Sequence, residues 1–135
     1  MGNQYTFLGR FDHKIDGKCR VTIPKDFYRQ LDEKRLILTK TLVADTPMIA
    51  VFPTREILIS ELVKIYDFDF DDVNYRRSIV EDFYYRDIDS ARRINLNNFD
   101  IFSGDMATII GNFDFFEIWD ASAYDRVKKE VGKHR

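Results

Sequence analysis

The feature that most constrains this chain of 135 residues is an internal repeat. The segment IDGKCRVTIP at residues 15–24 reappears without a gap as IDSARRINLN at residues 88–97. The same register continues downstream, where the apolar pair in RLILT matches the pair in ATIIG, and a slightly smaller offset matches VF in VFP with IW in FEIWD. Each copy is followed by a segment of helical character. A duplication of this length predicts two halves with the same order of elements.

The hydrophobic period predicts strands and then a helix in each half. In CRVTIP, Val21 and Ile23 alternate with polar neighbours, which is typical of a half-buried strand, and RRINL alternates in the same way. Elsewhere the apolar spacing is helical. Helices are predicted at residues 54–66, 72–85 and 121–131. We therefore expect the α+β class, with halves at 1–70 and 71–135 in one compact unit, because no segment rich in Gly, Ser or Pro separates them.

Composition excludes several classes of protein. Hydrophobic residues make up 44% of the chain and aromatic residues 15%, which is too apolar for a disordered chain and generous for a small monomer, so some aromatic residues are expected at a subunit interface. The sequence has no run of about 18 apolar residues and no signal-peptide core, which predicts a soluble, cytoplasmic protein with no membrane partner. The single cysteine, Cys19, excludes an intramolecular disulfide and a cysteine-rich zinc site.

Positive charge is concentrated in the first repeat, although the net charge is −2. Residues 10–40 carry nine Lys and Arg against five acids, whereas residues 67–89 carry eight acids against three arginines. The surplus begins with Arg10, Lys14 and Lys18, around the predicted turn. These three side chains are either solvated surface charges or contacts to nucleic-acid phosphates.

Both copies of the repeat contain an Asp-x-x-x-Arg loop. An aspartate and an arginine four residues apart across a tight connection can pair, and the carboxylate can also accept backbone N–H groups. We therefore expect the pairs Asp16 with Arg20 and Asp89 with Arg93 to fix the shape of their loops, since a carboxylate repels phosphate. Arg20 has two interpretations. It either only satisfies Asp16, or it reads a guanine in the major groove, where a bidentate pair discriminates bases by roughly 1 to 3 kcal/mol.

The order and duplication of these motifs resemble the MraZ family of bacterial transcriptional regulators. The matching stretches are FLGRFDHKIDGKCRVTIP, RLILTK, VFP, IDSARRINL, TIIG and FEIWD. The resemblance implies a duplicated swapped-hairpin β-barrel of the AbrB type, with helices packed outside it, and a ring-shaped homo-oligomer. It also implies a nucleoid-associated protein that binds double-stranded DNA at short direct repeats upstream of a cell-division and cell-wall gene cluster. We carry the DNA contacts over to the first copy only, at Arg10, Lys14, Lys18 and Arg20.

The chain departs from the family pattern inside the loops. The family usually has glycine before the arginine of each loop, whereas this chain has Cys19 and Arg92. If those positions adopt positive φ, a side chain there costs roughly 1 kcal/mol. Pro24 of the first copy is Asn97 in the second, so the second half is the more degenerate. The alternative function is therefore an oligomeric scaffold or protein-interaction module whose DNA-reading loops have decayed.

Other candidates for chemistry are weak, so we expect no enzyme and no metal, cofactor or small-molecule substrate. His13 and His134 have no partner nearby in the sequence. Cys19 lacks a recognisable nucleophile setting, although Lys18 and Arg20 beside it could lower the thiol pKa. The acidic run DFDFDD lacks the glycine turn and final glutamate of a calcium loop and is expected at a helix start. Nearby aromatic residues are expected in the core or at an interface, namely Phe68, Phe70, Phe83, Tyr84 and Tyr85.

Overall fold

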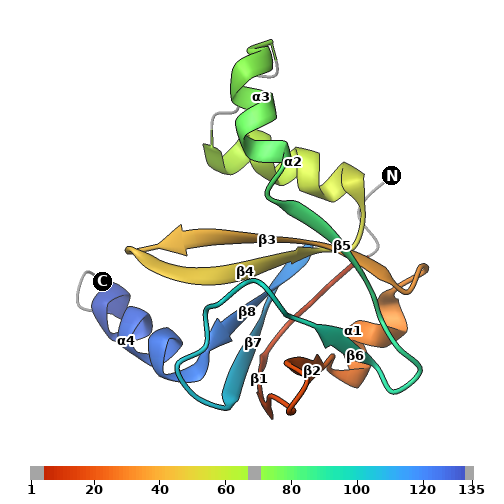
Figure 1. Cartoon of the computed structure of the whole chain (residues 1–135), viewed down its shortest axis with the longest axis vertical. Helices are drawn as coiled ribbons and strands as arrows, with labels where there is room; N and C mark the ends of the chain where they lie inside the picture. Colours follow the sequence, from red (N-terminus) through yellow and green to blue (C-terminus); the bar gives the residue numbers. More distant parts are fainter. Residues whose placement is uncertain (1–4, 67–70, 133–135) are drawn as a thin grey trace.

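A computed structural model describes residues 5–66 and 71–132 of the chain (Figure 1). In chain order the strands of this part are β1 (Arg10–Lys14), β2 (Arg20–Thr22), β3 (Arg35–Val43), β4 (Thr46–Phe52), β5 (Phe83–Asp87), β6 (Arg93–Asn95), β7 (Met106–Asn112) and β8 (Phe115–Asp120). The helices are α1 (Lys25–Gln30), α2 (Arg55–Tyr66), α3 (Val73–Val80) and α4 (Ala121–Gly132). The strands pair antiparallel, so the α+β class predicted from the sequence is confirmed.

The strand order interleaves the two copies of the repeat. A six-stranded sheet has the order β1-β7-β8-β4-β3-β5, and a small second sheet consists of β2 and β6. The strands of the two copies correspond as β1 to β5, β3 to β7 and β4 to β8. If each strand is replaced by its counterpart, the same order is obtained when read from the other edge of the sheet. An approximate twofold axis therefore lies between β4 and β8. Both edge strands pair with the other copy of the repeat, β1 with β7 and β5 with β3. Within the described residues β1 and β5 do not pair with each other, and the sheet stays open.

The main core lies between the large sheet and the β2–β6 ribbon. Phe7, Phe27 and Phe116 are fully buried at its centre, with ring centroids 5.0 to 5.2 Å apart. The alternation predicted for the repeat is confirmed, because Val21 pairs with Ile94 and both side chains point into this core. Burying side chains of this size stabilises the fold by roughly 1.5 to 3 kcal/mol each.

A second apolar cluster covers the opposite face of the large sheet. In β3, Leu36 and Leu38 belong to the main core while Ile37 between them belongs to this second cluster, as the two-residue period of a strand requires. α4 packs here through Val127 and α2 through Ile57 and Leu58, and α2 and α3 together project from the sheet as an arm (Figure 1). Asp120 begins α4, because its buried carboxylate accepts the Ala123 N–H at 3.2 Å.

Two of the three predicted helices are confirmed, and the third is too long. The helices at 54–66 and 121–131 correspond to α2 and α4, and the Thr54 hydroxyl caps α2 by accepting the Ile57 N–H at 3.2 Å. The helix predicted at 72–85 is wrong beyond Val80. Residues from Phe83 onward form β5, because they pair with β3, and aromatic side chains favour that extended pairing.

Two further predictions concern the segments beside these helices. The short connector after the first repeat strand contains α1, whose N-cap is Pro24. The acidic run was expected at a helix start, and Asp72 does cap α3 by accepting the Tyr75 N–H at 3.1 Å. Residues 67–70 of that run, which include Phe68 and Phe70, lie outside the described residues.

Candidate nucleic-acid interface

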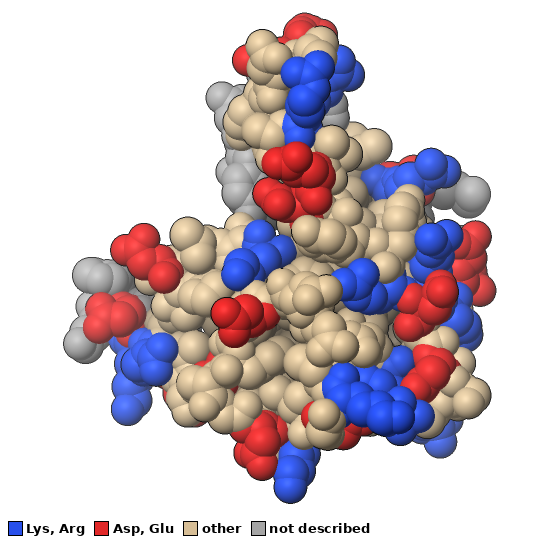
Figure 2. Space-filling view, viewed as in Figure 1, with Lys and Arg blue, Asp and Glu red and all other residues tan. Residues whose placement is uncertain are grey.

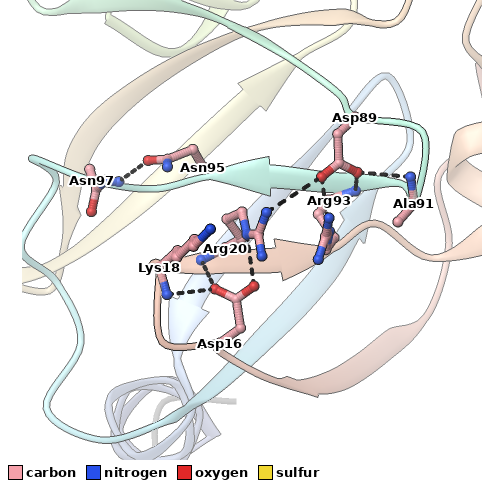
Figure 3. Close-up of polar contacts among 8 residues, drawn as sticks. All are labelled: Asp16, Lys18, Arg20, Asp89, Ala91, Arg93, Asn95 and Asn97. Carbon is pink, nitrogen blue, oxygen red and sulfur yellow. Dashed lines mark hydrogen bonds and ion pairs between the residues drawn. The ribbon is translucent and has the colours of Figure 1, made fainter.

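The two Asp-x-x-x-Arg loops lie at opposite ends of the β2–β6 ribbon (Figure 3). We call residues 15–19 the first loop and residues 88–92 the second loop. Because β2 and β6 run antiparallel, the first loop lies beside the end of β6 and the second loop beside the end of β2. Each loop is bonded to the opposite strand or its extension. Leu96 donates its N–H to the Cys19 carbonyl at 2.8 Å, and Ile23 donates to the Arg92 carbonyl at 2.7 Å.

Asp16 is the centre of the first loop. Its Oδ1 accepts the backbone N–H groups of Lys18 at 3.0 Å and Arg20 at 2.9 Å, and its Oδ2 accepts the Arg20 Nε–H at 2.8 Å (Figure 3). The backbone closes the same turn, since Cys19 N–H donates to the Asp16 carbonyl at 3.0 Å. One carboxylate therefore holds both the turn and the arginine that follows it.

Asp89 repeats this arrangement in the second loop. It accepts the N–H groups of Ala91 at 2.9 Å and Arg93 at 2.8 Å, and its Oδ2 accepts the Arg93 Nε–H at 2.8 Å. The structure thus brings together both pairs predicted from the sequence.

The carboxylates of both loops have a lowered pKa. For Asp16, partial burial opposes ionisation, but hydrogen bonds from the Arg20 backbone and side chain and from the Lys18 backbone outweigh it. For Asp89, the Arg93 backbone N–H is the largest cause, opposed by burial and reinforced by the Arg93 side chain and the Ala91 N–H. Both aspartates are therefore ionised when they hold their loops near neutral pH.

Arg20 contacts both aspartates. Besides its pair with Asp16, its Nη1 lies 3.9 Å from Asp89 Oδ2, and 24% of its side chain is exposed. A separation of 3.9 Å is too long for a hydrogen bond. Of the five N–H donors of the guanidinium, those on Nη1 and Nη2 make no hydrogen bond to the described residues, so the pair with Asp16 leaves donors for a ligand.

The other three predicted contact residues are placed differently. Lys18 is exposed at the tip of the first loop, and Lys14, at the end of β1, makes only a 3.7 Å ion pair with Asp105 between two exposed side chains. Arg10 is not with them, because strands rise about 3.4 Å per residue and Arg10 therefore lies about 14 Å along β1 from Lys14.

Arg10 is also occupied by acidic neighbours. It bonds Asp12 at 3.2 Å and Asp125 at 3.1 Å, and its guanidinium lies 5.2 Å from the Tyr124 ring centroid.

The residues that replace the family glycines adopt positive φ. Cys19 has φ 59° and Arg92 has φ 63°, in the left-handed region that favours glycine. The Cys19 side chain packs against the main core, and its thiol pKa is raised by this burial and by Asp16. The expectation that Lys18 and Arg20 lower that pKa is therefore wrong, because burial favours the neutral thiol.

Sequence reasoning overlooked two polar side chains on the ribbon. Since Val21 and Ile94 point into the core, the alternate positions lie on the outer face, and these include Thr22 and Asn95 as well as the two arginines. The two-residue period of the strands could have predicted that these side chains lie on the outer face.

Clusters of metal-ligating side chains and long apolar helices are both absent from the part of the chain that the structure describes. Among residues 5–66 and 71–132, no group of three or more His, Cys, Asp or Glu side chains could hold a metal ion. His13 lies in β1, and His134 is outside the described residues. No helix in the described part of the chain is long and apolar enough to cross a membrane.

Comparison with known proteins finds relatives that align over nearly the whole chain. No family model matches the chain. A protein from Corynebacterium jeikeium is 28% identical over 127 residues, which cover 87% of this chain and 83% of the relative. Others from Mesoplasma florum and Corynebacterium urealyticum are 24% and 25% identical and cover 92% and 88% of this chain, and 86% and 84% of their own lengths.

All three relatives carry the same name, transcriptional regulator MraZ, and none is named as an enzyme. That name agrees with the expectation that this chain is not an enzyme. Similarity over nearly the whole chain supports the membership of this protein in the MraZ family of transcriptional regulators.

Proposed function

We propose that this protein is a sequence-specific DNA-binding regulator that reads short direct repeats upstream of a cell-division and cell-wall gene cluster. The observation that carries the proposal is the first loop, where Asp16 fixes the turn and leaves Arg20 with free donors beside an exposed Lys18. The antiparallel ribbon next to it is of a size that the major groove admits. The names of the relatives support regulation of transcription.

The proposed roles follow from the contacts of each residue. Arg20 reads a base edge, while Lys14 and Lys18 contact phosphates. Within the described residues Lys14 makes only the 3.7 Å ion pair with Asp105, and Lys18 makes none. Asp16 and Asp89 hold the loops and do not touch DNA. Among the four cations carried over from the family, Arg10 fits a phosphate contact least well, because it would have to leave two carboxylates.

The wider architecture belongs to the same proposal. Residues 1–70 and 71–135 would be two AbrB-like halves of one unit, completing a swapped-hairpin barrel with the helices outside. The interleaved strand order supports this, because every edge strand of one copy pairs with the other copy. The main core, which the ribbon and the large sheet share, supports it as well.

We also propose that the protein forms a ring-shaped homo-oligomer through the arm made by α2 and α3. Ile59, Val63, Val73 and Val80 on this arm are large apolar side chains about half exposed or more. A groove of about 330 Å³ between the arm and the sheet is lined largely by apolar residues. Sedimentation equilibrium should show a species larger than a dimer, and a single 16.1 kDa species would contradict this proposal.

The test of function is a titration of the wild-type protein at low salt. One duplex carries the sequence immediately upstream of the gene cluster that encodes the protein, and the other is a scrambled duplex of the same length. We expect tighter binding to the first and affinity that falls steeply with salt for both. Binding to neither duplex would contradict DNA recognition and the expected association with the nucleoid.

The second candidate function is an oligomeric scaffold. The net charge of −2 favours it, and Figure 2 shows acidic and basic atoms mixed over much of the visible face rather than one broad basic surface. A stable oligomer that binds neither duplex would support the scaffold.

A further inference from the structure

The two loops carry the same charge in different places. The first loop and the arginine after it contain one acid, Asp16, and two cations, Lys18 and Arg20. The second loop and its arginine also contain one acid and two cations. However, Ala91 stands where the first loop has its lysine, and the extra cation is Arg92, one position later. The two loops thus have the same net charge, but the extra cation lies one position later in the second loop.

Arg92 occupies a position where a side chain is unfavourable. Its φ of 63° is in the left-handed region, where a residue with a side chain is less stable than glycine. The structural bond at this position does not require arginine, because Cys19 makes the equivalent carbonyl contact with an uncharged side chain. The strain therefore points to a use for the guanidinium itself.

The environment of Arg92 holds the guanidinium at the edge of the ribbon. Its carbonyl accepts the Ile23 N–H at 2.7 Å, and its Nε–H donates to the Ile23 carbonyl at 3.4 Å. These two contacts with Ile23 hold both the backbone of Arg92 and the part of its side chain up to Nε. The side chain is only partly buried, so the rest of the guanidinium can bind an anion.

The two loops give the ribbon a cation at each end. Lys18 lies at one end and Arg92 at the other, and the three paired positions between them span roughly 10 Å. Figure 3 shows Arg20 between the two loops, close to the second aspartate as well as its own. Figure 2 shows basic atoms gathered at the lower right, where Figure 1 places the turn between β5 and β6.

We infer that the second loop is a phosphate-binding part of the DNA interface, with Arg92 as its contact residue. The inference rests on the proposed function and extends it from the first loop to both ends of the ribbon. Arg92 contributes affinity without base selectivity, because a phosphate contact is the same for every sequence. The alternative role is a structural clip, by which we mean that Arg92 only holds the second loop to Ile23 through these hydrogen bonds.

The test compares Arg92→Gly with a matched control, Cys19→Gly. Both substitutions place glycine at an equivalent positive φ and relieve the same strain. Arg92→Gly should weaken binding equally to the upstream and scrambled duplexes and should flatten the slope of log K against log salt by about 0.9 for each subunit engaged. Cys19→Gly should leave that slope unchanged. Arg92→Gln, which keeps a donor-bearing side chain but removes the charge, should flatten the slope as the glycine variant does.

The outcomes separate the two proposals. If the wild type binds DNA and both Arg92 variants keep its slope, Arg92 is a structural clip and the inference fails alone. If the folded wild type binds neither duplex at low salt, the proposed function fails and the inference fails with it. Circular dichroism of each variant verifies that the proteins compared are folded.

Discussion

Gly111 in β7 lies directly beneath the segment that carries Phe7 into the core, and we expect Gly111→Ala to be strongly destabilising. A Cβ at this position would lie 2.5 Å from Leu8 N and closer still to the Phe7 carbonyl group. These are backbone atoms, so no side-chain rotation can relieve the overlap. The substitution must push the segment away from β7.

Three backbone hydrogen bonds resist that movement. Phe7 and Phe113 exchange two, at 2.8 and 3.0 Å, and Gly111 donates to the Gly9 carbonyl at 2.9 Å. Each contributes about 0.5 to 1.5 kcal/mol, and forcing extra volume into a packed site costs about 1 to 3 kcal/mol. The overlap is relieved partly by weakening these hydrogen bonds and partly by distorting the packed site. We therefore expect the free energy of unfolding to fall by about 2 to 4 kcal/mol.

Urea unfolding at fixed protein concentration measures this change. The single tryptophan, Trp119, is buried in the second cluster on β8 and reports the transition by fluorescence. Gly17→Ala is the matched control, because no atom of the described residues lies within 4 Å of its added Cβ, apart from Gly17 itself and its two chain neighbours. The control should change stability by no more than about 0.5 kcal/mol. If Gly111→Ala were as stable as this control, the packing of the Phe7 segment on β7 would be wrong.

Two other predictions concern the loops. Because Asp16 and Asp89 have a lowered pKa in the folded state, their contribution to stability is complete above the unfolded value of about 3.9 and is lost as pH falls through the lower folded value. Asp16→Asn and Asp89→Asn should therefore lower the Tm at neutral pH and make its decline in acid shallower; an unchanged Tm at neutral pH would show that the carboxylates do not hold the loops. Cys19, whose thiol pKa is raised by burial and by Asp16, should react with iodoacetamide more slowly in the folded protein than in urea, and equal rates would contradict its placement.

The parts of the fold that the sequence predicts correctly depend on local spacing. Val21 and Ile94 were assigned to buried strand positions from the two-residue period, and Thr54 was assigned to a helix start from its place before helical apolar spacing. β5 was missed because Val80 and Phe83 continue a helical pattern, while the choice of strand depends on pairing with β3, which is distant in the sequence. Local patterns cannot report such a partner.

The same distinction applies to the candidate site. The pair of Asp16 and Arg20 could be predicted because its members are four residues apart. The contact of Arg20 with Asp89 depends on pairing between β2 and β6, which join opposite copies of the repeat. Arg10 was grouped with the loop from its place in a basic segment, but its partner Asp125 comes from α4, which the charge pattern does not reveal.

The central claim is that Arg20 reads DNA and that Arg93 only holds its loop. Arg20→Ala and Arg93→Ala each remove an arginine whose Nε lies 2.8 Å from its own aspartate, so the two variants lose the same local ion pair. The measurement is the affinity of each folded variant for the upstream duplex relative to the scrambled duplex. We predict that Arg20→Ala loses roughly 5- to 150-fold of this preference, the equivalent of one bidentate base contact, and that Arg93→Ala keeps it. Full preference in a folded Arg20→Ala protein, or an equal loss in both variants, would contradict the account.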